Sequence, residues 1–123
     1  MDRMSLKKFL EQYIDGTPIY PSDFPMNVSD CYMFDFSGNT ALEENLSETH
    51  LIVFRRSPDI EEAEQASLDL MKRLNKLTNI NIGESHVLLI KTVGKHAEYK
   101  GRDEDGRFYF TSQYRLLLDD IIE

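Results

Sequence analysis

Apolar residues recur every three to four positions in two stretches of the chain, which is the period of an amphipathic helix. The first stretch runs from Ser5 to Ile14. Ser5 is placed to cap its first turn, and Gly16 suits the left-handed residue that follows a last turn. The apolar face that we expect to pack on a core comprises Leu6, Phe9, Leu10, Tyr13 and Ile14.

The second helical stretch starts at Pro58, and proline fits the first helical position. Asp59 and Glu62 have the spacing of a capping box. Acidic residues near its start and basic residues near its end complement the helix dipole. Its apolar stripe predicts a helix that reaches Thr78, and this stripe comprises Ile60, Ala63, Ser67, Leu70, Met71, Leu74 and Leu77.

Runs of alternating or continuous apolar residues predict four main strands. These strands cover Asp30–Phe36, Thr49–Arg56, Ser85–Val93 and Phe108–Leu116. An aspartate–glycine pair before the last strand is a strong hairpin signal, so His96–Lys100 is a candidate strand on the other side of that turn. Side chains of the last strand alternate, and we expect its aromatic side to pack inward.

Three further segments carry turn or loop chemistry. Three prolines prevent regular structure in Thr17–Asn27, apart from a short edge strand at Ile19–Tyr20. The acidic segment Thr40–Glu48 has no clear period and is predicted as a loop, and Asn79–Gly83 is predicted as a polar turn. The order of elements predicts an α+β two-layer sandwich, in which two helices cover a mainly antiparallel sheet of about four strands. We expect residues 1–123 to form a single domain.

Composition narrows the class of protein. The chain has 123 residues, and 14 Lys and Arg against 22 Asp and Glu give it a formal net charge of −8. This charge disfavours a whole-surface grip on DNA or on an anionic membrane. No apolar run approaches the ~20 residues of a membrane span, and the N-terminal stretch does not have the pattern of a signal peptide. With one cysteine, the chain cannot form an internal disulfide, and we expect a soluble intracellular protein.

The histidines offer a weak candidate for a metal site. None of His50, His86 and His96 stands three or four residues from another, but His50 and His86 lie at the mouths of two predicted strands. A metal pair would need a third ligand, such as Glu84 or Glu48. Because nothing in the spacing selects this set, a structural or solvent-facing role is favoured.

Other reactive residue types also lack a specifying pattern. Cys31 begins a strand without a glycine elbow, which favours a structural thiol over a nucleophile. Asp35 could pair with glutamates of the 43–48 segment, yet surface charge explains them equally well. Asp103 opens a run similar to a calcium loop, but Tyr114 stands where that loop needs glutamate. The residues predict no catalytic residue, no cofactor and no metal, and they favour a binding or structural protein.

The apolar C-terminal strand predicts self-association. Leu116–Leu118 and Ile121–Ile122 lie at what the pattern places as a sheet edge, and they exceed what two small helices can cover. We therefore expect a partner subunit at this edge.

Four strings between Ile52 and Phe108 carry a resemblance to a known family. They are a strand that ends in basic residues (Ile52–Arg56), an acidic helix start (Asp59–Ala63), a helix end (Leu74–Asn79) and the string Gly-Arg-Asp-Glu-Asp-Gly-Arg-Phe at Gly101–Phe108. Together they resemble the bacteriophage minor capsid proteins of the tail-terminator and head–tail joining type. The resemblance covers Thr49 to Leu116, and its last string is the most specific.

The resemblance implies a small α+β subunit that forms a ring, commonly a hexamer. Such a ring caps the head-proximal end of a tail tube and docks the filled head. Its partners would be further copies of itself, the tail tube protein and the head completion or connector protein, in the virion and, during assembly, in the bacterial host cytoplasm. An acidic ring would let DNA slide through its bore, unless Lys91, Lys95 and Arg102 gathered there.

Three segments are candidates for subunit contacts from their position alone: Pro18–Met26, Ala41–Glu48 and Arg102–Arg107. Within them we select as interface residues Tyr20, Phe24, Glu43, Glu44, Arg102, Asp103 and Arg107. Two other classes stay open. One is a small bacterial adaptor or regulatory domain that binds a protein through an edge strand. The other is an enzyme that uses Cys31 or a histidine pair.

Overall fold

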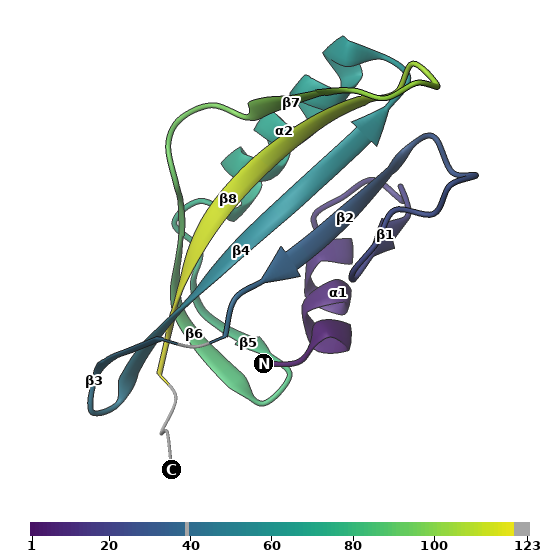
Figure 1. The fold of residues 1–123 in the computed structure, drawn as a ribbon. Coiled ribbons are helices and arrows are strands. Elements are labelled where there is room, and N and C mark those ends of the chain that lie inside the picture. Colours follow the sequence, from purple (N-terminus) through teal and green to yellow (C-terminus); the bar gives the residue numbers. More distant parts are fainter. Residues whose placement is uncertain (39, 120–123) are drawn as a thin grey trace.

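The computed structural model describes residues 1–38 and 40–119, which contain two helices and an eight-stranded sheet (Figure 1). The helices are α1 (Arg3–Glu11) and α2 (Ile60–Leu74). The strands, in chain order, are β1 (Ile19–Tyr20), β2 (Cys31–Phe36), β3 (Thr40–Glu43), β4 (Leu46–Ser57), β5 (Thr78–Ile82), β6 (Ser85–Thr92), β7 (Glu98–Arg102) and β8 (Phe108–Leu118).

The strands lie in the order β1-β2-β4-β8-β6-β5, with β3 paired to β4 and β7 paired to β8. These pairings are antiparallel except that of β1 with β2, which is parallel. The sheet curls into a half-barrel with both helices on the same face (Figure 1). The predicted α+β class with two helices is confirmed, whereas the predicted sheet of about four strands is too small.

β4 and β8 form the centre of the sheet, and their register determines which side chains face the helices. Leu51 lies opposite Tyr114 and Val53 lies opposite Ser112, and all four are buried. Because side chains alternate along a strand, their neighbours point to the other face, which neither α1 nor α2 covers. We call this second face the open face. The expected inward packing of Phe110, Tyr114 and Leu116 is confirmed.

Both helices bury most of the apolar stripe that the sequence predicts, but Ile60 is 42% exposed and α2 begins at this residue and not at Pro58. The other helix ends also differ from the prediction. α1 begins at Arg3, because the Asp2 carboxylate accepts the backbone N–H of Ser5 at 2.8 Å and caps the helix in place of Ser5. Asp59 caps α2 as predicted. α2 stops at Leu74, four residues before Thr78, since Asn75 is extended and Lys76 has a φ of 68°.

Two segments predicted as a loop and a turn are strands, so those predictions are wrong. Residues 40–48 form β3 and the start of β4, a hairpin in which every residue of β3 is exposed. The predicted turn at Asn79–Gly83 is almost all in β5, which pairs with β6 and buries Ile82. Most side chains of both strands are exposed, and β5 alternates polar residues with Ile80 and Ile82 over only five residues, so the pairing with a neighbouring strand decides their conformation.

The expected sheet edge at Leu116–Leu118 is wrong as well. β8 lies between β4 and β6, and its Leu116 and Leu118 side chains belong to the buried core. Ile121–Ile122, the other half of that prediction, lie outside the described residues. α1 and α2 have 9 and 15 residues, and no helix of the described part of the chain is long and apolar enough to cross a membrane.

Candidate functional site

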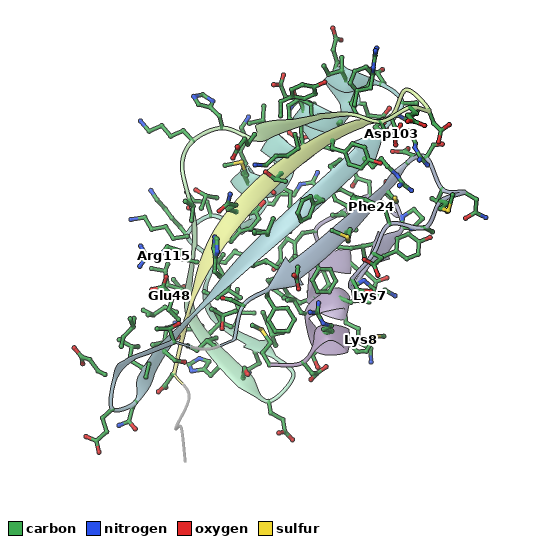
Figure 2. The ribbon with its side chains drawn as sticks, in the orientation of Figure 1. Lys7, Lys8, Phe24, Glu48, Asp103 and Arg115 are labelled. Carbon is green, nitrogen blue, oxygen red and sulfur yellow. The ribbon has the colours of Figure 1, made fainter. Side chains whose placement is uncertain are left out.

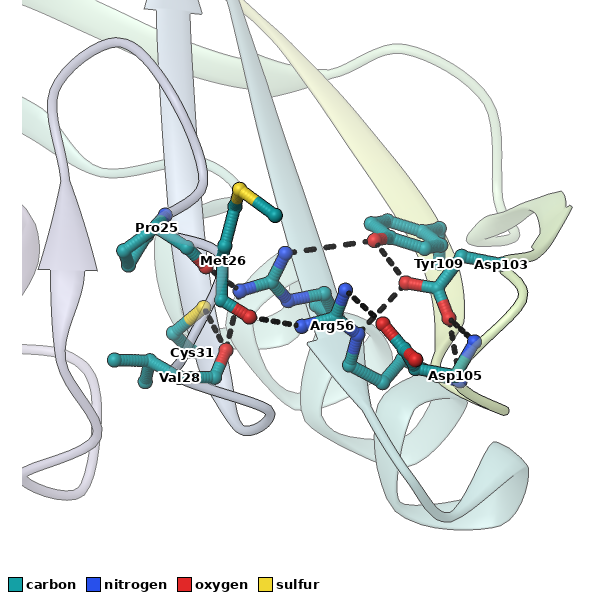
Figure 3. A network of polar contacts seen from close by, with 9 residues as sticks. Pro25, Met26, Val28, Cys31, Arg56, Asp103, Asp105 and Tyr109 are labelled. Atoms are coloured by element: carbon teal, nitrogen blue, oxygen red, sulfur yellow. Dashed lines mark hydrogen bonds and ion pairs between the residues drawn. The ribbon is translucent and has the colours of Figure 1, made fainter.

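The proline-rich arm, defined as residues 21–28, is held by Arg56 at the end of β4 (Figure 3). The Arg56 residue is 2% exposed, and its Nη2 donates to the backbone carbonyls of Pro25 and Val28. Its guanidinium also lies over the Phe24 ring, 4.5 Å from the ring centroid. A flat guanidinium can stack and donate in its plane at once, so one side chain fixes an arm that has no regular structure over these residues.

The tip between β7 and β8, defined as residues 103–107, is organised by Asp103. Its carboxylate accepts the backbone N–H groups of Asp105 and Arg107 at 3.0 Å, and Nε of Arg107 at 2.7 Å. The Tyr109 hydroxyl donates to the same carboxylate at 2.6 Å. The bond from Tyr109 is the largest cause that holds the pKa of Asp103 well below its usual range, followed by the bonds from Arg107 and Asp105.

The arm and the tip meet. Arg107 Nη1 donates to the carbonyl of Met26 at 2.8 Å, and the rings of Phe24 and Tyr109 lie edge to face with centroids 5.4 Å apart. Arg56 Nη1 lies 3.5 Å from the Tyr109 hydroxyl, which closes the network (Figure 3). Two segments that are about 80 residues apart in the chain therefore form one surface, which we call the arm–tip surface.

The selected interface residues divide between two places. Phe24, Asp103 and Arg107 contact one another's segments in the arm–tip surface. Arg102 is the exposed last residue of β7 beside it, and Tyr20 lies on the edge strand β1. Figure 2 shows Phe24 and Asp103 toward one end of the sheet and Glu48 toward the other end.

Glu43 and Glu44 lie in the β3–β4 hairpin at the opposite end, where Figure 1 shows β3 projecting from the body of the molecule. β4 joins the two ends over 12 residues, a span of about 40 Å at the usual rise per residue. All residues from 40 to 45 are exposed, including Leu42 at 48%. The structure thus places two of the three candidate segments together and the third far from them.

A cleft of about 450 Å³ lies between the end of α1 and α2, with buried Arg55 in its lining. Arg55 pairs with Asp30 and with Glu62, the latter at 3.6 Å, and its guanidinium lies over the Tyr32 ring at 4.8 Å. Across the cleft, Arg73 donates to the carbonyl of Tyr13 at 2.7 Å. These contacts tie α2 to the segment that follows α1, and β4 to β2, which gives the cleft a structural role.

Cys31 does not have the environment of a nucleophile. Its residue is fully buried, its thiol lies 3.6 Å from the carbonyl of Val28, and burial raises the pKa of the thiol. A reactive thiol needs a lowered pKa and access to substrate. The structure therefore supports the structural reading of this residue.

The candidate metal and acid–base sets are not assembled. Among the described residues, no group of three His, Cys, Asp or Glu side chains is placed to hold a metal ion, which includes the set of His50 and His86 with Glu84 or Glu48. Asp35 pairs with Arg3 at 2.8 Å and lies opposite Ile52 on β4, four residues along that strand from Glu48. Glu48 is instead bound by Arg115 at 2.6 and 2.8 Å.

Sequence reasoning missed the two residues that organise the arm–tip surface, Arg56 and Tyr109. A usable signal was present, because a basic pair ends the strand Thr49–Arg56 and Tyr109 follows Asp103 by six residues. The pairing of Arg56 with Tyr109 across β4 and β8 depends on register, which the local sequence does not state.

No protein-family model and no curated protein sequence matches this chain. Among solved structures, the chain is similar to a chain of a structure described as the virion of a native gene transfer agent particle. The two share 8% sequence identity with a TM-score of 0.61, and the match covers 93% of this chain and 84% of the other. At this identity the likeness shows a shared fold.

Proposed function

We propose that this chain is a structural subunit of a phage-like particle, and that it forms a ring that terminates a tail tube and joins it to the head. Its partners in this role are further copies of itself in a hexamer, a tail tube protein and a head completion or connector protein. The observation that supports the role most is a fold shared, over 93% of the chain, with a chain of a gene transfer agent virion. The strings at Ile52–Arg56 and Gly101–Phe108 support it independently.

The shape of the subunit suits a ring. A closed ring of identical subunits needs two different surfaces on each copy, one to give and one to receive. The β3–β4 hairpin projects from the body of the molecule (Figure 1), so the hairpin and the body offer two different surfaces. The net charge of −8 suits a bore through which DNA passes without adhering.

Electron microscopy tests this function directly. The purified chain is imaged alone and after addition of tail tubes, and we expect a six-fold ring at one end of the tube. The absence of any assembly in both samples would overturn the proposal.

An adaptor that binds through an edge strand is the second candidate, and the sheet offers one observation for it. β5 is the last strand of the sheet, and its side chains are mostly exposed. Light scattering separates the two functions, because an adaptor of this kind stays monomeric and a ring subunit does not.

A further inference from the structure

The β3–β4 hairpin is an acidic, partly apolar projection, and every residue of β3 is exposed among the described residues. Leu42 is 48% exposed, and Glu43 and Glu44 follow it at the turn. Within residues 1–38 and 40–119, neither glutamate has an ion-pair partner. A short two-stranded hairpin with an exposed apolar side chain has little stability of its own.

A groove of complementary character lies on the body of the molecule. It has a volume of about 350 Å³ and runs between α2 and the connection from β6 to β7; we call it the α2 groove. Half-buried Leu68 provides its apolar part, with Met71, which is 5% exposed, also in the lining, and the exposed Lys72 and Lys95 provide its charge. Neither lysine pairs with a carboxylate of the described residues, so two cations without an ion-pair partner stand beside the half-buried Leu68.

The hairpin and the groove match in chemistry and differ in position. The hairpin carries one exposed leucine beside two glutamates, and the groove carries apolar side chains beside two lysines. Such complementarity of charge orients protein partners. The hairpin of a copy projects away from its own α2 (Figure 1). A contact between unlike surfaces of two copies is heterologous, and it closes into a ring when the rotation between copies allows.

We propose that the β3–β4 hairpin of one copy docks in the α2 groove of the next copy, with Leu42 against Leu68 and Met71, and with Glu43 and Glu44 facing Lys72 and Lys95. This inference rests on the proposed function as a ring subunit and names the surfaces that join its copies.

A second groove on the open face is a poorer receptor. It has a volume of about 170 Å³, and Leu89 and Leu117 supply its apolar part beside Lys91 and Arg115. Arg115 is already bound by Glu48 at 2.6 Å, which leaves Lys91 as its one cation without a described partner. It therefore matches two glutamates less well than the α2 groove does.

Charge reversal tests the docking in the full chain. We expect Glu43→Lys with Glu44→Lys, and separately Lys72→Glu with Lys95→Glu, each to raise the concentration needed for assembly by about tenfold or more, since like charges then face each other. The four changes together restore opposite charges and should return that concentration to within about threefold of the unmodified chain. Light scattering measures the assembly, and circular dichroism checks that every variant is folded.

Lys8→Glu with Lys91→Glu is the matched control, because it reverses two exposed lysines outside the α2 groove. We expect it to assemble like the unmodified chain. A loss of assembly in this control with no loss in the Lys72 and Lys95 variant would place the contact elsewhere and overturn the inference.

A covalent test is independent of charge. Leu42→Cys and Leu68→Cys in one chain should give a ladder of disulfide-linked oligomers on oxidation, whereas Leu42→Cys with Leu117→Cys should not. Assembly of the unmodified chain with no effect of the reversals and no ladder would overturn the docking mode and leave the proposed function standing. No assembly of the unmodified chain, alone or on tail tubes, would overturn both.

Discussion

Arg55 and Arg56 are adjacent and both 2% exposed, yet they serve opposite faces of the sheet. A buried cation is stable only when carbonyls, carboxylates or aromatic rings surround it. Arg55 meets this condition on the helix side through Asp30, Glu62 and Tyr32. Arg56 meets it on the open face through two backbone carbonyls and the Phe24 ring.

The contacts of Arg56 predict a large loss of stability when they are removed. Arg56→Ala leaves the carbonyls of Pro25 and Val28 without their donor and opens a space beside Phe24. We expect the free energy of unfolding to fall by about 3 kcal/mol. Arg115→Ala is the control, since this exposed side chain makes a surface ion pair with Glu48 and its loss costs at most about 1 kcal/mol. Urea denaturation of both variants checks this, and equal losses would contradict it.

The lowered pKa of Asp103 predicts that the stability of the folded chain depends on pH. Its pKa in the folded state is lowered, first by the Tyr109 hydroxyl, so the folded chain binds fewer protons than the unfolded chain as the pH falls toward the usual aspartate value of about 3.9. The stabilisation is complete above that value and is lost as the pH falls below it. We expect Asp103→Asn to be less stable than the unmodified chain at neutral pH, and the difference to shrink as the pH falls below about 4. Urea denaturation across this range measures it, and a constant difference at every pH would refute it.

At the scale of elements, β3 and β5 show why short, mostly exposed strands are hard to predict from the hydrophobic pattern of the sequence. β3 is exposed on both faces, and β5 alternates over only five residues and turns Ile80 and Ile82 toward the core. Their conformation comes from hydrogen bonds to β4 and β6. The early end of α2 has a similar origin, because the Asn75 side chain accepts the backbone N–H of Thr92 at 3.1 Å and turns the chain toward β5.

The turn between β5 and β6 packs against α1 through Gly83, which predicts a sensitive position. Gly83 has a φ of +61°, and a Cβ there would lie 2.6 Å from Ser5 Oγ and 2.9 Å from Ser5 Cβ. We expect Gly83→Ala to lower the free energy of unfolding by about 3 kcal/mol, from backbone strain and from the displaced start of α1.

Gly16→Ala is the matched control for this prediction. Gly16 has a φ of +71° with no atom within 4 Å of the Cβ position, so only the backbone cost of about 1 kcal/mol applies. Thermal or urea unfolding compares the two variants. Equal losses of unfolding free energy in the two variants would show that the contact with Ser5 does not contribute to stability.

At the scale of the whole molecule, net charge and local shape contribute separately to the proposed ring. The net charge of −8 belongs to the entire chain, whereas the hairpin, the α2 groove and the arm–tip surface each have their own character. The proposed ring needs both, since its copies join through local complementarity while its overall charge repels DNA.

The charge leads to a prediction for the assembled protein. We expect it to leave duplex DNA unbound at about 0.15 M salt, because phosphate contacts require a surface that gathers Lys and Arg. Fluorescence anisotropy with labelled DNA measures this. Binding that weakens steeply as salt is raised would contradict it and would point to Lys91, Lys95 and Arg102 around the bore.

The sequence by itself determined the two helices, the four apolar strands, the cap at Asp59 and the acidic balance, because each of these is written in local spacing or composition. Tertiary structure alone decided that β3 and β5 are strands, that β8 is central, and that the arm at Met26 meets Arg107. The reason is that strand pairing and the burial of Arg55 and Arg56 depend on register between segments far apart in the chain. Local hydrophobic and polar spacing indicates which face of a strand is buried, but it does not say with which distant segment the strand pairs.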